Sequence, residues 1–342
     1  ARKALYNYLI YPEGHPKAIK NRLKYLPILK AKEELMKCDK LDENAKKLAE
    51  EAHATWEVFI SKFGVGSEEN KRNAWEYISS KLPVMACIRN LRNLLNNKVD
   101  TKLFLPKLQD EKTILNSKQL PFRWFSAYRE IEGNDNPSTG KVLDALQNAM
   151  DISIQNVPRL GGITFSSADN SGSMDSPLSE RSKVKYCDVA NIMQAMLAHV
   201  SDDILTSVFA EHFKIVNVSK RDGIITNMKK FKATDVGYST DAYKALMYLN
   251  ENKIKVDRII IFSDMQCYDS FGRYSVVGER SLGTEFKKYK RQVNPNVRLY
   301  SIDLAGYGTA QFPQDELNVA LIAGWSDKIF EFIKLFESDK KQ

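Results

Sequence analysis

Apolar residues in the first half of the chain recur at spacings of three and four. The positions that follow this spacing are Leu23, Leu26 and Leu29, then Leu48, Ala52, Trp56 and Phe59, and later Leu82, Met85, Ile88, Leu91 and Leu95. Such spacing places the apolar side chains on one face of a helix. Breaks that contain Gly, Pro or Asn separate the groups at residues 12–14, 64–67 and 133–137. We therefore expect stacked helical hairpins, and Ser67, followed by two glutamates, predicts a helix N-cap.

The second half alternates between short β-rich runs and helical stretches. The predicted strands are residues 163–168, 204–209, 215–218, 258–262 and 297–304, and the predicted helices are residues 186–199, 241–250, 282–291 and 328–336. This alternation implies a mostly parallel, doubly wound sheet with helices on both faces, joined to the first half near residues 156–159. Residues 163–168 are more hydroxyl-rich than a central strand of such a sheet should be.

Composition and charge add a contrast between the two halves. Hydrophobic residues make up 43% of the 342 residues, as in an ordinary globular protein, and the longest apolar runs are too short to cross a membrane. Residues 1–150 carry 26 Lys and Arg against 19 Asp and Glu, a net charge of +7, whereas residues 151–342 carry 25 against 24, a net charge of +1. This asymmetry indicates either an anionic partner such as nucleic acid or simply a Lys-rich helical surface. The four scattered cysteines favour a reduced, cytoplasmic protein.

Three segments at predicted strand ends or in adjoining loops carry oxygen ligands. The first predicted strand leads into Asp169, Ser171 and Ser173, whose side chains would share one side of an extended loop. Thr240 precedes a predicted helix, and Asp264 ends the buried run 259–263. Carboxylate and hydroxyl oxygens are hard ligands that suit Mg²⁺ or another divalent cation. Since Ser and Asp are also common in ordinary turns, turn chemistry is the alternative.

The three segments in this order resemble the metal-ion-dependent adhesion site of von Willebrand A domains. The resemblance implies that residues 155–342 form an A-type, Rossmann-like domain. It also implies a metal-ligand set of Asp169, Ser171, Ser173, Thr240 and Asp264.

The first half carries a second set of motifs. A helix with Trp75 is followed by Pro83, Ala86 and Arg89-Asn90-Leu91, then by Pro121-Phe122, Ala127 and Tyr128. This order, with an A-type domain after it, resembles the TROVE module of the Ro autoantigen family. The resemblance implies that residues 1–154 are HEAT-like helical repeats of a ring that binds small structured Y RNAs and the single-stranded ends of misfolded RNAs. The helical half is shorter than is usual in that family, so either upstream repeats are missing or the chain is a reduced member.

Basic residues in the helical half supply candidate RNA contacts. They are Lys17, Lys20, Arg22, Lys24, Lys30, Arg89 and Arg92, with Tyr25 among the first of them. Cations that meet phosphates beside an aromatic ring suit single-stranded RNA, although a solvated helix face has the same composition. The leading hypothesis is a non-enzymatic RNA-binding protein with a Mg²⁺-binding A-type domain. The alternative is a protein-interaction module whose metal captures an acidic residue of a partner protein.

A metal-dependent enzyme has less support. The hydroxyl-rich site lacks the clustered carboxylates of two-metal phosphoryl transfer. The four histidines form no H-E-x-x-H motif, and the sequence contains no P-loop and no G-x-G-x-x-G. We therefore expect no catalytic residues.

Overall fold

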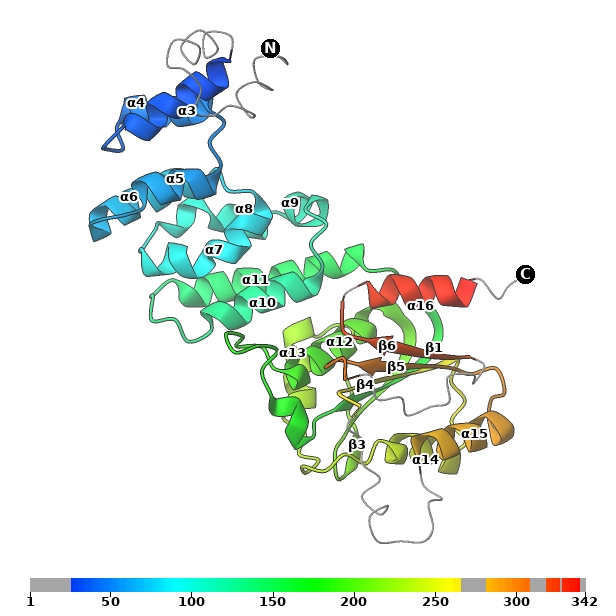
Figure 1. The fold of residues 1–342 in the computed structure, drawn as a ribbon. Coiled ribbons are helices and arrows are strands. Elements are labelled where there is room, and N and C mark those ends of the chain that lie inside the picture. Colours follow the sequence, from blue (N-terminus) through cyan, green and yellow to red (C-terminus); the bar gives the residue numbers. More distant parts are fainter. Residues whose placement is uncertain (1–25, 266–280, 308–317, 327, 339–342) are drawn as a thin grey trace. The chain divides into compact units, whose positions relative to one another are not determined.

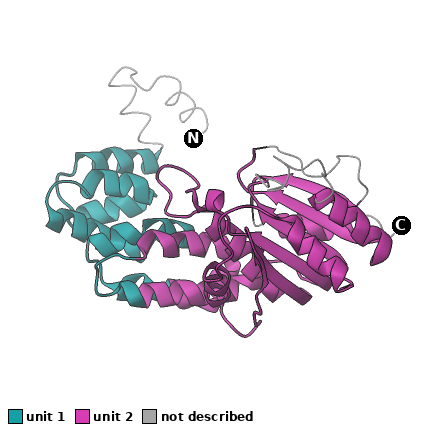
Figure 2. Ribbon diagram, turned by 90° about the horizontal axis from the view of Figure 1, so that it is seen from below, with its two compact units in different colours: residues 1–107, 133–140 teal, residues 108–132, 141–342 magenta. Residues whose placement is uncertain are grey.

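A computed structural model gives the fold, and it describes residues 26–265, 281–307, 318–326 and 328–338. The chain forms two compact units, coloured teal and magenta in Figure 2. Unit 1 comprises residues 1–107 and 133–140, and unit 2 comprises residues 108–132 and 141–342. This grouping by contacts does not test the predicted division after residue 154, which stays a prediction. Lys17, Lys20, Arg22 and Lys24 lie outside the described residues.

The described part of the first half is helical, as predicted. Its helices are α3 (Pro27–Lys37), α4 (Glu43–Glu51), α5 (Trp56–Phe63), α6 (Glu68–Ser79), α7 (Val84–Asn96), α8 (Leu105–Gln109), α9 (Glu111–Asn116), α10 (Pro121–Ile131) and α11 (Thr139–Ser153) (Figure 1). Side-chain caps begin several of them. The predicted cap is confirmed, because the Ser67 hydroxyl accepts the Asn70 N–H at 3.2 Å, and Asp42 caps α4 in the same way. Pro27 and Pro121 stand at the first turns of α3 and α10, where no intrahelical N–H is needed.

The second half contains a six-stranded sheet in the order β3-β2-β1-β4-β5-β6. The strands are β1 (Leu160–Asp169), β2 (Ser201–Phe209), β3 (Phe213–Ile215), β4 (Arg258–Ser263), β5 (Arg298–Asp303) and β6 (Val319–Ala323). All neighbouring strands pair in parallel except β2 and β3, which are antiparallel. The predicted fold class, a helical region followed by a von Willebrand A-type α/β domain, is thus confirmed. The short strand β6 was not predicted.

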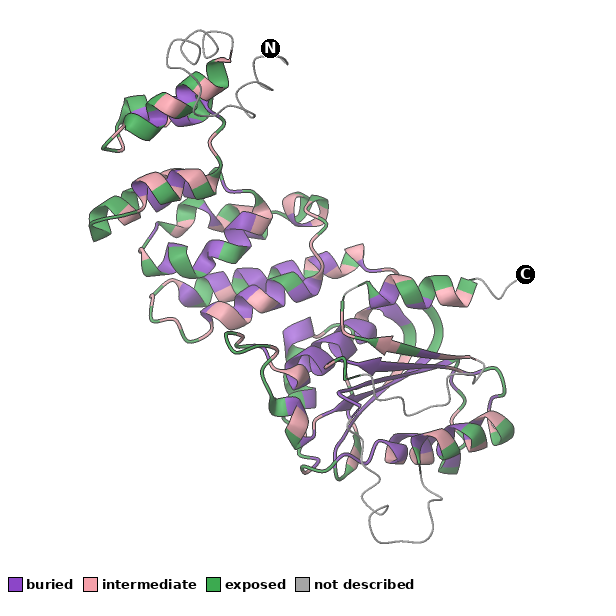
Figure 3. Cartoon of the chain, viewed as in Figure 1, coloured by how far each residue is buried: buried purple, intermediate pink, exposed green. Residues whose placement is uncertain are grey.

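Helices cover both faces of this sheet. They are α12 (Tyr186–Val200), α13 (Ile224–Lys232), α14 (Tyr243–Glu251), α15 (Leu282–Gln292) and α16 (Ile329–Ser338). On one face, α14 and α15 pack on an apolar cluster that includes Phe165, Ile259 and Leu299. On the other face lies α12, which is buried almost all round (Figure 3) and is correspondingly apolar on most sides.

The hydroxyl-rich sequence of β1 is explained by a buried hydrogen-bond network. The Ser166 hydroxyl donates to Gln194 of α12 at 2.8 Å, and the Gln194 amide donates to the Ser207 carbonyl of β2. The Ser207 hydroxyl donates to Ser167 at 2.9 Å. All four side chains are fully buried. A buried polar group costs little when it is hydrogen-bonded, so β1 can hold the centre of the sheet without a continuous apolar sequence.

One helix starts on a residue far away in the sequence. Gly223 precedes α13 and has no side chain to cap it, and the Asp151 carboxylate accepts the Ile224 N–H at 2.9 Å instead. A Cβ on Gly223 would lie 2.8 Å from Asp151 Oδ2, so the glycine makes this approach possible. The last turn of α11 therefore supplies the N-terminal cap of α13.

Among the described residues, no helix is long and apolar enough to span a membrane. Three cysteines fall within the described part of the chain, namely Cys38, Cys87 and Cys187, and all three are free thiols.

Candidate functional site

The strand order reverses between β1 and β4, which lie side by side although α12, β2, β3, α13 and α14 separate them in sequence. At such a reversal the loops after the two strands diverge to opposite sides, and ligands of α/β folds bind in the crevice between them. Asp169 ends β1 and Asp264 directly follows β4. The sheet topology thus brings two of the predicted ligand segments to one edge.

Hydrogen bonds hold the first loop in place. Asp169 Oδ1 accepts the Ser171 N–H at 2.8 Å, and Asp169 Oδ2 accepts the Ser263 hydroxyl of β4 at 2.7 Å. The Ser171 and Ser173 hydroxyl oxygens lie 3.3 Å apart. One carboxylate and two hydroxyls from positions i, i+2 and i+4 therefore gather at the end of β1.

The second loop reaches the first through its backbone. The Gly172 N–H donates to the Tyr238 carbonyl at 3.0 Å, and a Cβ on Gly172 would meet the Tyr238 ring at 3.5 Å. Thr240 follows two residues later and is buried at 8% exposure, and the Asp241 N–H donates to the Ala210 carbonyl just beyond β2. Tyr238 is 84% exposed at this edge, a feature that the sequence analysis did not single out.

The electrostatics of this edge suit a cation. Asp169 is fully buried and Asp264 is 2% exposed. Burial raises the pKa of Asp169 to about 6 in spite of hydrogen bonds from Ser171 and Ser263, and the nearby Asp264 carboxylate raises it further. Two buried carboxyl groups beside two hydroxyls form an oxygen-rich donor set that a hard divalent cation would neutralise. The residues present fit such an ion.

This donor set is poor in the usual metal-binding side chains. The described residues contain no group of three or more His, Cys, Asp or Glu side chains that could hold a metal. The predicted ligands depend instead on Ser and Thr hydroxyls, which leave room for water or an anionic ligand on the ion. The metal assignment therefore stays a prediction. Ser263 is not among the predicted ligands, but its hydrogen bond holds the Asp169 carboxylate in place.

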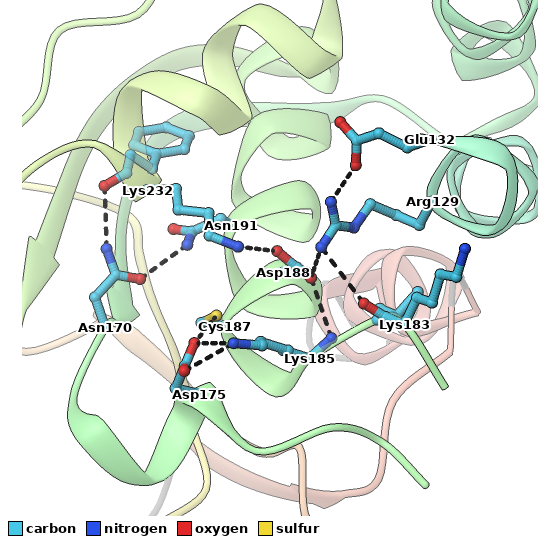
Figure 4. A network of polar contacts seen from close by, with 12 residues as sticks. Arg129, Glu132, Asn170, Asp175, Lys183, Lys185, Cys187, Asp188, Asn191 and Lys232 are labelled. Atoms are coloured by element: carbon cyan, nitrogen blue, oxygen red, sulfur yellow. Dashed lines mark hydrogen bonds and ion pairs between the residues drawn. The ribbon is translucent and has the colours of Figure 1, made fainter. Parts of the chain in front are cut away.

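A polar network adjoins the loop that begins at Asp169 and involves residues of α10, α12 and α13 (Figure 4). Asn170 is held by the Asn191 amide at 2.8 Å and itself donates to the Phe231 carbonyl at 3.0 Å. One turn before Asn191 on α12, the fully buried Asp188 accepts from Lys232 at 2.6 Å and from Arg129 of α10 at 3.3 Å. Hydrogen bonds thus connect α12 and α13 to the residue next to Asp169, and α10 is joined to α12 through Asp188.

The candidate RNA contacts are placed less completely. The structure describes Lys30, Arg89 and Arg92, and all three are exposed. Arg89 and Arg92 are three residues apart on α7, so they share one face of that helix. Lys30 lies on α3, with its ammonium 3.8 Å from Glu34. All three are accessible to a polyanion, and their predicted role stays a prediction.

Comparisons with known proteins agree with the sequence motifs. The model of the TROVE domain matches residues 38–197, and that of the Ro60 vWA domain matches residues 165–337. Telomerase protein component 1 of Mus musculus is 40% identical over 83 residues, and the Rattus norvegicus protein is 37% identical over 83 residues. Each of these matches covers 23% of this chain and only 3% of the relative.

Among solved structures, the Ro (RSR) protein of Deinococcus radiodurans matches with a TM-score of 0.70. The match covers 97% of this chain and 66% of that one, at 18% sequence identity. At this identity the likeness concerns the fold. It extends over both the helical region and the A-type domain.

Proposed function

The chain belongs to the Ro family, in which a TROVE domain is followed by a Ro60-type vWA domain, and from this premise we propose that it binds RNA without acting on it as an enzyme. The observation that carries the proposal is the TROVE match over residues 38–197. It is supported by the net charge of +7 on residues 1–150 and by the exposed Arg89 and Arg92. The partners are small structured RNAs of the Y type and the unpaired ends of misfolded RNAs.

Phosphate contacts would dominate such binding, because cations on a helical surface meet the RNA backbone rather than base edges. Each contact releases counterions, so raising salt from about 50 to about 200 mM should weaken binding of a small structured RNA by roughly ten-fold or more. Fluorescence anisotropy at several salt concentrations measures this. Affinity that stays constant over that range would contradict phosphate-dominated recognition.

A double variant tests the face of α7. Arg89→Gln with Arg92→Gln should reduce the salt dependence and weaken RNA binding several-fold, because two phosphate contacts are lost. The matched control is Lys287→Gln with Arg291→Gln, which removes the same charge from the exposed face of α15 in the A-type domain. Equal losses in both double variants would indicate a general charge effect and would count against the α7 face.

The A-type domain would hold Mg²⁺ or another divalent cation through Asp169, Ser171, Ser173, Thr240 and Asp264. When bound, such an ion supplies a positive centre with room for an anionic oxygen of a ligand. A second candidate function follows from the same edge: the ion captures an acidic side chain of a protein partner, and the exposed Tyr238 adds contact area. Loss of protein capture in Asp169→Ala, with RNA binding intact, would favour this second function.

Metal binding should appear as a thermal shift. An ion that binds only the folded state raises the unfolding midpoint, so millimolar Mg²⁺ should stabilise the chain and Asp169→Ala should abolish the effect. The control is Asp175→Ala, which removes a largely exposed carboxylate close by. Because the pKa of Asp169 is raised to about 6, protons compete with the ion below that pH, and the Mg²⁺-induced shift should grow as pH rises through 6. A shift that persists in Asp169→Ala would place the ion elsewhere.

A further inference from the structure

Unit 1 contains a cavity of about 530 Å³ between α4, α5 and α6. Its floor is apolar, with Phe59 and Ile78 buried, and Trp56 contributes a half-buried indole. Its other lining residues include the exposed Glu50 and Lys81, so the cavity opens to solvent on a charged side. Cavities of this size and composition take small ligands, with an apolar body inside and few polar groups that fix orientation.

The aromatic wall is held rigidly. Trp75, only 5% exposed, packs against Trp56 with ring centroids 6.4 Å apart. Phe59 stacks on Tyr77 at 4.9 Å and 28°. The Lys81 ammonium lies 4.1 Å from the centroid of the Tyr77 ring, so one face of that ring is covered. Trp56 is therefore the aromatic side chain that a flat ligand would meet.

The polar side of the cavity carries an acceptor and a donor next to each other. The Lys81 ammonium donates to Glu50 Oε1 at 2.5 Å and to the Tyr77 hydroxyl at 2.8 Å. The Tyr77 hydroxyl in turn lies 3.3 Å from Glu50 Oε1 and 3.3 Å from the Lys46 carbonyl. The hydrogen bond from Lys81 lowers the pKa of Glu50, so the carboxylate accepts at neutral pH.

We propose that this cavity binds one unpaired guanine base of an RNA strand, stacked on Trp56 and read on its edge by Glu50 and Lys81. Guanine presents N1–H and N2–H donors, which a carboxylate accepts, beside the O6 acceptor, which an ammonium satisfies. Adenine and the pyrimidines do not offer two neighbouring donors next to a carbonyl in this order. Stacking on an aromatic side chain is the common way in which proteins hold unpaired bases.

This inference rests on the proposed function, because RNA is the source of the base. It adds a preference for one base, which contacts to the phosphate charges of RNA do not provide. The lining carries two carboxylates, those of Glu50 and Glu57, against the Lys81 ammonium, so the cavity has no excess of positive charge. A phosphate is therefore a poor occupant, and the phosphate contacts of the strand would lie elsewhere on the helices.

The test uses the full chain, with GMP, AMP and CMP as probes in saturation-transfer NMR. A second set of probes is an RNA hairpin with a blunt end and the same hairpin with an unpaired 3′ tail containing G. Trp56→Ala should weaken binding of GMP and of the tailed hairpin by roughly ten-fold and leave the blunt hairpin unchanged. Glu50→Gln, at an exposed position, keeps the size of the side chain and should remove the preference for GMP over AMP. Glu51→Gln, on the next residue of α4, is the control and should change neither.

The outcomes separate the two proposals. Equal binding of GMP and CMP, or a Glu50→Gln variant with unaltered base preference, overturns the guanine cavity while the RNA-binding function stands. GMP binding that depends on Trp56, in a chain that binds neither hairpin, overturns the proposed function and leaves the cavity. If GMP does not bind but a Phe-containing peptide binds to the chain and loses affinity in Trp56→Ala, the inference is overturned in favour of a protein partner.

Discussion

Replacing Asp188 by alanine should lower the free energy of unfolding by about 3 kcal/mol, because the change leaves charges without their buried partner. The carboxylate is fully buried and accepts from Lys232 at 2.6 Å, from Arg129 at 3.3 Å and from the Lys185 N–H at 3.1 Å. The last contact also caps α12. Lys232 is 42% exposed and stays partly solvated, and Arg129 keeps its ion pair with Glu132. Because neither cation is left fully uncompensated, the loss should lie near the lower end of the usual range.

Urea unfolding followed by circular dichroism measures this loss. The matched control is Asp175→Ala, whose carboxylate is 65% exposed and pairs with Lys185 at 2.7 Å in the same network. An exposed pair contributes less than about 1 kcal/mol, so the control should unfold nearly as the unaltered chain does. Similar midpoints for Asp188→Ala and Asp175→Ala would show that the buried network has no special part in stability.

The second large effect is expected at Arg258, which is 3% exposed. Its guanidinium forms a two-point ion pair with Glu337 of α16 at 2.8 and 2.7 Å, and also donates to Thr164 at 2.8 Å and to the Gly161 carbonyl at 2.6 Å. Arg258→Met keeps most of the side-chain volume but removes the donor to Thr164 and to the Gly161 carbonyl, and it leaves Glu337 with only the Tyr300 hydroxyl at 3.0 Å and the more distant Arg298. We expect the free energy of unfolding to fall by about 3 to 5 kcal/mol. Relative to the unaltered chain, amide exchange should accelerate more in α16 than in α12.

The control for Arg258→Met is a change in Arg298, a second arginine near Glu337. Arg298 lies 3.8 Å from Glu337 and is 24% exposed, so Arg298→Gln should cost less than about 1 kcal/mol. Hydrogen exchange read by mass spectrometry distinguishes local release of α16 from global unfolding. Unchanged exchange in α16 of Arg258→Met would mean that Phe330 and Ile333, both fully buried, anchor the helix without the ion pair.

The features that could be predicted from sequence are those with local signals. The strands that end at Asp169 and Ser263 contain β-rich runs of sequence, and a polar loop follows each of them. Their ends could therefore be placed to within a residue. Because parallel strands end at a shared edge, the convergence of the loops after them also followed from sequence. The same locality made the Ser67 cap visible, since its acceptor and donor are three residues apart.

Features that depend on distant partners could not be predicted in this way. Helix α13 was missed because its cap, Asp151, lies 73 residues before Ile224. The hydroxyls of β1 did not fit the apolar sequence expected at a sheet centre, because Gln194 and Ser207, which form hydrogen bonds with them, come from other elements. Ser263 could have been found by its position at a strand end beside Asp264, but its hydrogen bond to Asp169 required the strand order.

The cap that Asp151 gives to α13 has a consequence for where the chain can be divided into fragments. A fragment that starts at the join near residue 156 keeps every strand of the sheet, but it loses the cap of α13 and the Arg129 contact of Asp188. Such a fragment should therefore be less stable than one that also includes α10 and α11.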